Sequence, residues 1–143
     1  MKNIHLALGI FSLLLFSITA SAQAAEKSLY ERLGGKPAVT AVVSQFVDYN
    51  SADKVIRSRW DPEHSDDLKQ YLVELVCQAS GGGCVYTGKH MDVAHAGLNV
   101  TEDEFNRVAA NLVKALDKFN VPEKEKGELL AIIGSLKGKV VGQ

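Results

Sequence analysis

The sequence has no excess of either charge. Its 143 residues include 16 Lys and Arg against 17 Asp and Glu, a formal net charge of -1. A protein that attracts nucleic acid or an anionic membrane over a distance carries a clear positive excess. Nucleic acid is therefore excluded as an expected partner. Apolar residues make up 46% and charged residues 23%, which is typical of a chain that folds into one globular domain.

The sequence also lacks the motifs of several common enzymes. It has no Ser-His-Asp order, no phosphate-binding glycine loop and no zinc-ligand spacing. No segment rich in Val, Ile and Thr alternates with a period of two, as a half-buried β-strand would. Apolar residues instead recur three and four positions apart, so the predicted fold class is all-α.

Local signals place the helices. Ser28 with Glu31 and Thr101 with Glu104 are spaced as capping boxes, Pro37 suits the first position of a helix, and Ser65 suits a cap before two acids. A polar bend is expected from residue 50 to residue 62, and a short helical piece from 91 to 96. We expect five or six helices whose apolar faces include Val39, Val42, Val43, Phe46 and Val47; Leu68, Tyr71, Leu72, Leu75 and Val76; Phe105, Val108, Leu112 and Leu116; and Leu129, Ile132, Ile133, Leu136 and Val140.

The one long apolar run lies at the amino terminus. It extends from Leu6 to Ile18, follows Lys2, and is shorter than the ~20 residues that span a bilayer. Small residues follow it, which completes the pattern of a secretory signal. Residues 1–24 are therefore predicted to be a signal peptide, cleaved after Ala22 or Ala24, and residues 25–143 to be a periplasmic or secreted domain without membrane attachment. An uncleaved anchor is the alternative.

The two cysteines, Cys77 and Cys84, flank a flexible glycine-rich segment. In an oxidising compartment we expect them to form a disulfide, and closing so short a loop is worth roughly 2–3 kcal/mol by chain entropy. Two reduced cysteines are the alternative. A thiol-redox function is less consistent with the sequence, because the pair does not lie at a helix start, where a thiolate would be stabilised.

His95 is the histidine with the most suggestive surroundings. Small and apolar residues flank it from Val93 to Val100, and a buried neutral imidazole is a good ligand for a transition metal. The alternative is a core histidine bonded to a backbone carbonyl. His90 lies five positions from His95, a spacing that would not let two histidines of one helix bind the same metal ion. His64 lies among acidic residues, which is typical of a histidine on the solvated surface.

Two stretches carry a family resemblance. Residues 29–35 read Leu-Tyr-Glu-Arg-Leu-Gly-Gly, and residues 86–101 contain Tyr-Thr-Gly and Ala-His-Ala-Gly-Leu. Phe46 and Asp53 also match the pattern of the second helix in one family. Residues 28–141 thus resemble a group 1 truncated haemoglobin. The resemblance implies a truncated globin-like two-over-two helical sandwich that holds haem b.

The resemblance also implies the roles of individual residues. His95 is the proximal haem ligand and so the metal-binding residue. Tyr71 is the candidate hydrogen-bond donor to a diatomic ligand on the opposite, distal side; the alternative is an aromatic ring whose hydroxyl faces water. The other residues expected to contact haem or its ligand are Phe46, Val47, Trp60, Leu68 and Leu72.

Three of these positions depart from the common family pattern. Val47 stands where many members have a tyrosine, and Leu72 where glutamine is frequent. Trp60, preceded by Arg59, stands where a phenylalanine usually packs on the haem. The distal side is therefore expected to be less polar than in the best-known members, and the larger indole to narrow the pocket or displace the group.

The expected function is oxygen binding by haem held without a covalent link, because the chain has no CxxCH motif. The resemblance also implies binding of nitric oxide and its oxidation to nitrate. Such nitric oxide dioxygenase activity requires a partner reductase, because the chain has no flavin or nicotinamide domain. The alternative is an exported helical binding or structural protein on a globin scaffold that has lost haem.

Overall fold

The computed structural model describes residues 26–60 and 63–143. The predicted signal peptide lies outside the described residues. Within them the secondary structure is helical apart from one isolated bridge between Val100 and Val141, so the all-α prediction is confirmed. No helix in this part of the chain is long and apolar enough to cross a membrane. The elements are α1 (Leu29–Arg32), α2 (Gly35–Ala52), η1 (Arg57–Arg59), α3 (Ser65–Ala79), α4 (Met91–His95), α5 (Glu102–Lys118), α6 (Glu123–Ser135) and η2 (Lys137–Lys139).

The two predicted capping boxes begin α1 and α5. The backbone N–H of Glu31 donates to Ser28 Oγ at 3.2 Å, and the Ser28 N–H donates to the Glu31 carboxylate at 2.8 Å. Thr101 and Glu104 repeat both bonds at 3.2 and 2.8 Å. Each box satisfies backbone donors that have no partner inside the helix, so these two starts are determined locally.

The other predicted boundaries were less accurate. Helix α2 begins at Gly35, two residues before Pro37, because Gly34 adopts the left-handed region (φ 97°) and turns the chain into the helix early. Pro37 still falls in the first turn, where a backbone N–H is not needed. Ser65 is the first residue of α3, and His64 is its cap.

The expected bend begins at Asp53 rather than at residue 50, because α2 continues to Ala52; turns and the short helix η1 then follow as far as Trp60. Asn50 is fully buried in α2, and its amide donates to the Phe46 carbonyl at 2.9 Å. Its side-chain oxygen accepts from Asn111 of α5 at 2.9 Å. This partner 61 positions away lets a polar residue extend the helix into the core.

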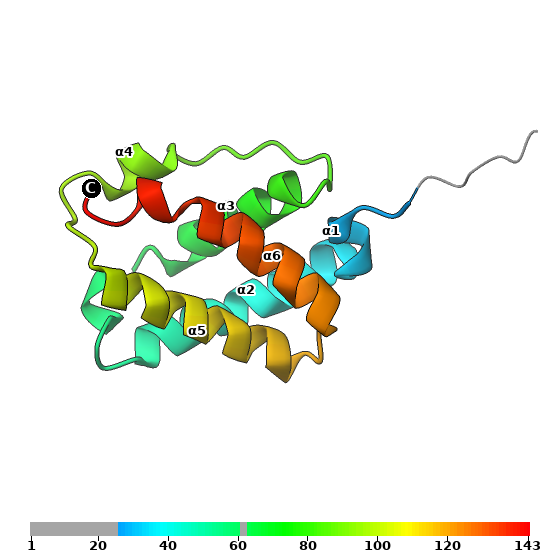
Figure 1. Cartoon of the computed structure of the whole chain (residues 1–143), viewed down its shortest axis with the longest axis horizontal. Coiled ribbons are helices and arrows are strands. Elements are labelled where there is room, and N and C mark those ends of the chain that lie inside the picture. Colours follow the sequence, from blue (N-terminus) through cyan, green and yellow to red (C-terminus); the bar gives the residue numbers. More distant parts are fainter. Residues whose placement is uncertain (1–25, 61–62) are drawn as a thin grey trace, which may run out of the picture.

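Two helix pairs, α2 with α3 and α5 with α6, form the body of the domain (Figure 1). Helix α2 packs against α3 and α5, and α6 packs against α5 and α1. The core between them includes Val47, Leu116 and Leu129, each at most 2% exposed. This is the predicted two-over-two sandwich. Short helix α4 lies at one edge, where it contacts η2.

The predicted disulfide is present and joins α3 to the loop that follows it. The Cα atoms of Cys77 and Cys84 are 5.7 Å apart. Cys77 is fully buried and Cys84 is exposed. The bond therefore attaches a surface loop to the inner side of α3.

Candidate functional site

A large apolar cavity lies between the two helix pairs and α4. Its volume is about 490 Å³, and it is lined by residues of α2, α3, α4, α5 and α6. Small-molecule and cofactor sites usually occupy ~300–1,000 Å³ and are mainly apolar with a few polar groups. The polar groups on this wall include Arg59, Tyr71, Tyr86, Lys89 and Glu104. The cavity has the size and character of a cofactor site.

The structure brings together six of the seven residues predicted for the site. Phe46 reaches the cavity from α2 and His95 from α4, and the other four lie on or near α3: Trp60, Leu68, Tyr71 and Leu72. Val47 is the exception. It belongs to the buried core and is not among the described residues that line the cavity. Val43 and Phe46, one turn apart, form the cavity side of α2 instead.

His95 is held in a defined orientation at the end of α4. Its Nδ1 lies 2.7 Å from the carbonyl oxygen of Met91, one turn earlier. With Nδ1–H donating to that carbonyl, the lone pair is on Nε2, which is the arrangement of most metal-binding histidines. The ring is half-buried and lines the cavity. The hydrogen bond to a backbone carbonyl, which was expected of an ordinary core histidine, is therefore present. It leaves the second ring nitrogen available to a ligand.

The other two described histidines lie at helix starts. His90 is the cap of α4 and His64 the cap of α3, and both are exposed. Neither is among the described residues that line the cavity. His95 is thus the histidine that the fold directs to the site.

Trp60 packs against Phe46 without filling the cavity. Their ring centroids are 5.5 Å apart and the planes meet at 87°, an edge-to-face contact. Both rings line the cavity, and the 490 Å³ remain beside them. The structure therefore does not show the closed pocket that the larger indole could have caused.

An ion pair that the sequence did not predict closes one edge of the cavity. Arg59 Nε and Nη2 donate to the two carboxylate oxygens of Glu104 at 3.0 and 3.2 Å, and Nη1 donates to the Leu98 carbonyl at 2.8 Å. The pKa of Glu104 is lowered, mainly by the hydrogen bond that its carboxylate accepts from the Thr101 N–H and next by those that it accepts from Arg59. Arg59 and Glu104 are 45 positions apart, so no local pattern relates them.

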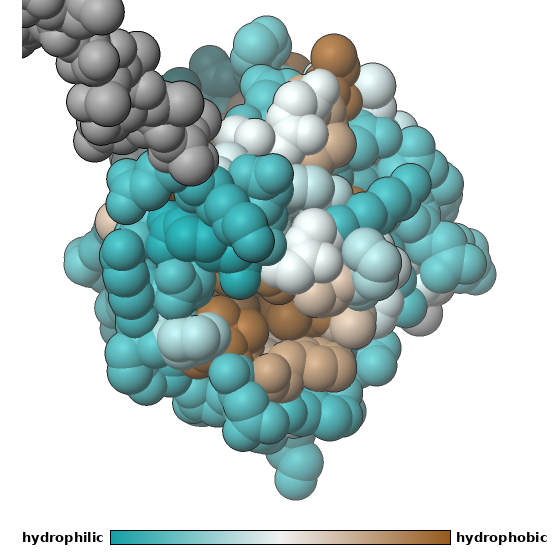
Figure 2. All heavy atoms as spheres, turned by 90° about the vertical axis from the view of Figure 1, so that its right-hand side faces the viewer, coloured by the Kyte–Doolittle hydropathy of each residue, from teal (hydrophilic) through white to brown (hydrophobic). Residues whose placement is uncertain are grey.

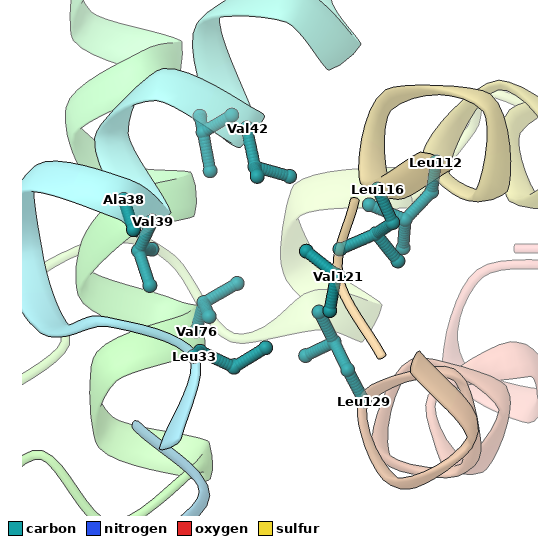
Figure 3. A pocket seen from close by; sticks show the side chains of 10 residues that line it. Leu33, Ala38, Val39, Val42, Val76, Leu112, Leu116, Val121 and Leu129 are labelled. Carbon is teal, nitrogen blue, oxygen red and sulfur yellow. The ribbon is translucent and has the colours of Figure 1, made fainter. Parts of the chain in front are cut away.

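A second, smaller apolar cavity adjoins the first. Its volume is about 30 Å³, and Figure 3 shows side chains of Leu33, Val39, Val121 and Leu129 around it. Three residues line both cavities: Val43, Val76 and Leu112. Figure 2 views the end of the molecule that carries α1 and shows apolar residues in a hollow there. The two cavities thus share an apolar wall made by Val43, Val76 and Leu112.

Comparison with known proteins settles the family. The model of the bacterial-like globin family matches residues 28–141. Group 1 truncated hemoglobin GlbN of Mycolicibacterium paratuberculosis is 33% identical over 113 residues, which are 79% of this chain and 83% of the relative. The chain belongs to the group 1 truncated haemoglobins. Its resemblance at residues 28–141 is therefore confirmed.

Solved truncated haemoglobins share the whole fold. The Fe(III) form of the Tetrahymena pyriformis protein superposes with a TM-score of 0.78 at 26% identity, covering 82% of this chain and all of that one. A 2/2 hemoglobin of a Synechococcus species, solved in the cyanomet state with covalently attached heme, has a TM-score of 0.72 at 30% identity over 79% and 95% of the two chains.

The residues of this truncated haemoglobin fit haem, and it is a haem-binding globin. Porphyrin supplies four iron ligands of its own, so the protein needs to add one. His95 offers a single imidazole nitrogen with its tautomer fixed. The aromatic and aliphatic walls suit the flat apolar macrocycle. Nothing in the structure favours the alternative of a scaffold that has lost its haem.

Trp60 provides a direct test of where haem binds, because it is the only tryptophan in the sequence and lines the cavity. Titration of the apoprotein with haemin should quench nearly all tryptophan emission at one equivalent, through energy transfer to the porphyrin beside the indole. The measurement is steady-state fluorescence alongside the Soret absorbance. Bright emission from protein with a full Soret band would mean that haem lies elsewhere, and a Trp60→Phe variant gives the tyrosine background.

Proposed function

We propose that this protein is an exported haem b globin that binds oxygen and oxidises nitric oxide to nitrate with electrons from a separate reductase. When bound, haem would supply an iron that takes a diatomic ligand, and His95 is the residue that would hold it. The observation that carries the proposal is the His95 imidazole, fixed by the Met91 carbonyl at 2.7 Å and directed to an apolar cavity.

The proximal residues hold and tune the iron. The Met91 carbonyl accepts the Nδ1 proton of His95, which orients the ring and makes Nε2 more basic. Because this acceptor belongs to the backbone of α4, the imidazole cannot rotate without breaking its hydrogen bond to the Met91 carbonyl. His95 therefore presents Nε2 to the cavity.

The distal wall is mainly apolar, and such a wall limits the access of water. Phe46, Leu68 and Leu72 line it, and water exclusion slows oxidation of a ferrous haem. The smaller cavity is divided from the large one by Val43, Val76 and Leu112, so uncharged gases are expected to reach the site through it when these side chains move.

Tyr71 is the distal candidate for donating a hydrogen bond. It lines the cavity from α3 and is 40% exposed, so its hydroxyl can serve either a ligand or solvent. A hydroxyl that donates to bound oxygen stabilises the negative charge that oxygen acquires. The strength of the hydrogen bond from Tyr71 to oxygen is expected to determine whether the protein stores oxygen or turns it over.

Two parts of the proposal rest on the sequence. Export is inferred from residues 1–24, with cleavage after Ala22 or Ala24, and the presence of a disulfide between Cys77 and Cys84 is consistent with an oxidising compartment. The partner reductase is inferred because residues 28–141 form a globin, and returning its iron to the ferrous state requires electrons from another source.

Rapid mixing tests the reaction. Ferrous protein in air-saturated buffer, mixed with one equivalent of nitric oxide, should become ferric and release one equivalent of nitrate. Stopped-flow absorbance and ion chromatography measure the two products. Protein saturated with carbon monoxide is the control and should form little nitrate. Unconsumed nitric oxide, or nitrate at the level of buffer alone, would contradict the proposed reaction.

A further inference from the structure

Residues 84–89 form an extended segment that runs back beside α3, which we call the strap. Three attachments hold it. Cys84 is bonded to Cys77, the Tyr86 N–H donates to Gln78 Oε1 at 2.5 Å, and both the N–H and the hydroxyl of Thr87 donate to Glu74 Oε2, at 3.0 and 2.6 Å. In Figure 1 this segment crosses one edge of the molecule between α3 and α4.

The strap is a wall of the haem cavity. Tyr86, Thr87, Gly88 and Lys89 line the cavity, whereas Val85 on the same segment is 75% exposed. The strap is thus one layer thick, with haem on one side and water on the other. Its shape is specific, because the Tyr86 hydroxyl donates to the Lys89 carbonyl at 2.9 Å and the tyrosine ring leaves no room for a Cβ at Gly88.

The attachments of the strap differ from those of the other walls. Helices α2, α3 and α5 are joined by buried apolar packing, and moving any of them would expose core residues such as Leu116 and Val47. The strap is held to α3 by the disulfide and by side-chain hydrogen bonds. Opening it costs few buried contacts once the disulfide is broken, so it is the wall that can open locally.

Glu74 is the main polar attachment. The pKa of this carboxyl is lowered because the carboxylate accepts several hydrogen bonds. The largest effect comes from the Thr87 hydroxyl, followed by Gln70 and by the Thr87 N–H. Glu74 lies one turn before Cys77 on α3, so the two attachments act on the strap at neighbouring points. Together they hold both the beginning and the middle of the strap.

We propose that haem enters and leaves the cavity past the strap, and that the Cys77–Cys84 disulfide and Glu74 lock this route. The inference rests on haem binding at His95. It makes haem retention depend on the redox state of two cysteines that are not among the described residues lining the cavity.

Unlocking is a thiol–disulfide exchange with a dithiol reductant. A thiolate of the dithiol attacks the sulfur of Cys84, the exposed residue of the pair, and Cys77 leaves as a thiolate that takes up a proton. The second thiol of the reductant then displaces Cys84, which is protonated in turn. Two electrons and two protons reach the cysteines, and the dithiol ends as a disulfide.

Haem transfer to excess apomyoglobin tests the proposal on the full mature chain loaded with ferric haem. Opening the lock, by tris(2-carboxyethyl)phosphine or by the double variant Cys77→Ser, Cys84→Ser, should accelerate transfer at least tenfold. Glu74→Gln should accelerate it severalfold. The matched control is Arg32→Met, which removes the ion pairs of α1 with Glu125 and Glu128 of α6 and should change the rate less than twofold.

Hydrogen exchange distinguishes local opening from a general loss of stability. On reduction, the amides of Tyr86 and Thr87 should lose protection while the amides of α5 keep theirs. Transfer rates that agree within twofold in all variants, each with a normal Soret band, would overturn the lock alone. A missing Soret band in every variant would instead mean that haem binding itself had failed. Equal loss of protection in α5 and the strap would also overturn the proposal.

Discussion

Replacing His95 by glycine is expected to weaken haem binding by at least about 100-fold, since outer-shell partners of a metal ligand alone are worth 10–100-fold. The substitution removes the imidazole that the Met91 carbonyl orients, and it leaves a space in the cavity wall. Imidazole in solution can occupy that space and supply the missing nitrogen. The measurements are haemin titration and the ferrous spectrum, with and without millimolar imidazole.

The design includes a matched control on the same helix. His90→Gly changes the exposed cap of α4 and should leave both affinity and spectrum as in the natural protein. Rescue by imidazole shows that the fold is intact and that only the nitrogen was lost. An unchanged ferrous spectrum in His95→Gly would mean that another group binds the iron, and the proximal assignment would be wrong.

The parts of the fold that were predictable are those determined by neighbours in the chain. Ser28 with Glu31 and Thr101 with Glu104 begin their helices as expected, because each capping box needs four residues and no tertiary partner. The start of α2 was misplaced because the left-handed conformation of Gly34 outweighs the preference of Pro37. The end of α2 was misplaced because Asn50 is stabilised by Asn111, a residue that is distant in sequence.

The same distinction applies to the site. His95 was identified because its motif is local, and the structure places it on the cavity as expected. The Arg59 to Glu104 pair and the attachment of Thr87 to Glu74 join residues 45 and 13 positions apart on different elements, and no spacing rule predicts such pairs. Val47 was assigned to the cavity because the resemblance puts it where many members have a tyrosine, but small differences in helix orientation decide which of two neighbours faces a cavity and which faces the core.

Replacing Leu72 by glutamine is expected to slow oxygen dissociation by roughly 10-fold to 100-fold, because a hydrogen bond to a charged acceptor is worth about 1.5–3 kcal/mol. Leu72 lines the cavity from α3, and the family resemblance puts it on the distal side, where an amide could donate to a ligand that carries partial negative charge. Carbon monoxide carries little charge, and its dissociation should change far less. Stopped-flow displacement of oxygen by carbon monoxide gives the rate.

Leu72→Met and Tyr71→Phe complete the experiment. Leu72→Met keeps the apolar character and approximate volume of the side chain, so it should leave oxygen dissociation nearly unchanged. If Tyr71 already donates to oxygen, Tyr71→Phe should accelerate dissociation and the gain from Leu72→Gln should be largest in that background. If the Tyr71 hydroxyl faces water, Tyr71→Phe should have no effect. A Leu72→Gln protein that releases oxygen as fast as Leu72→Met would show that this turn of α3 does not face the bound ligand.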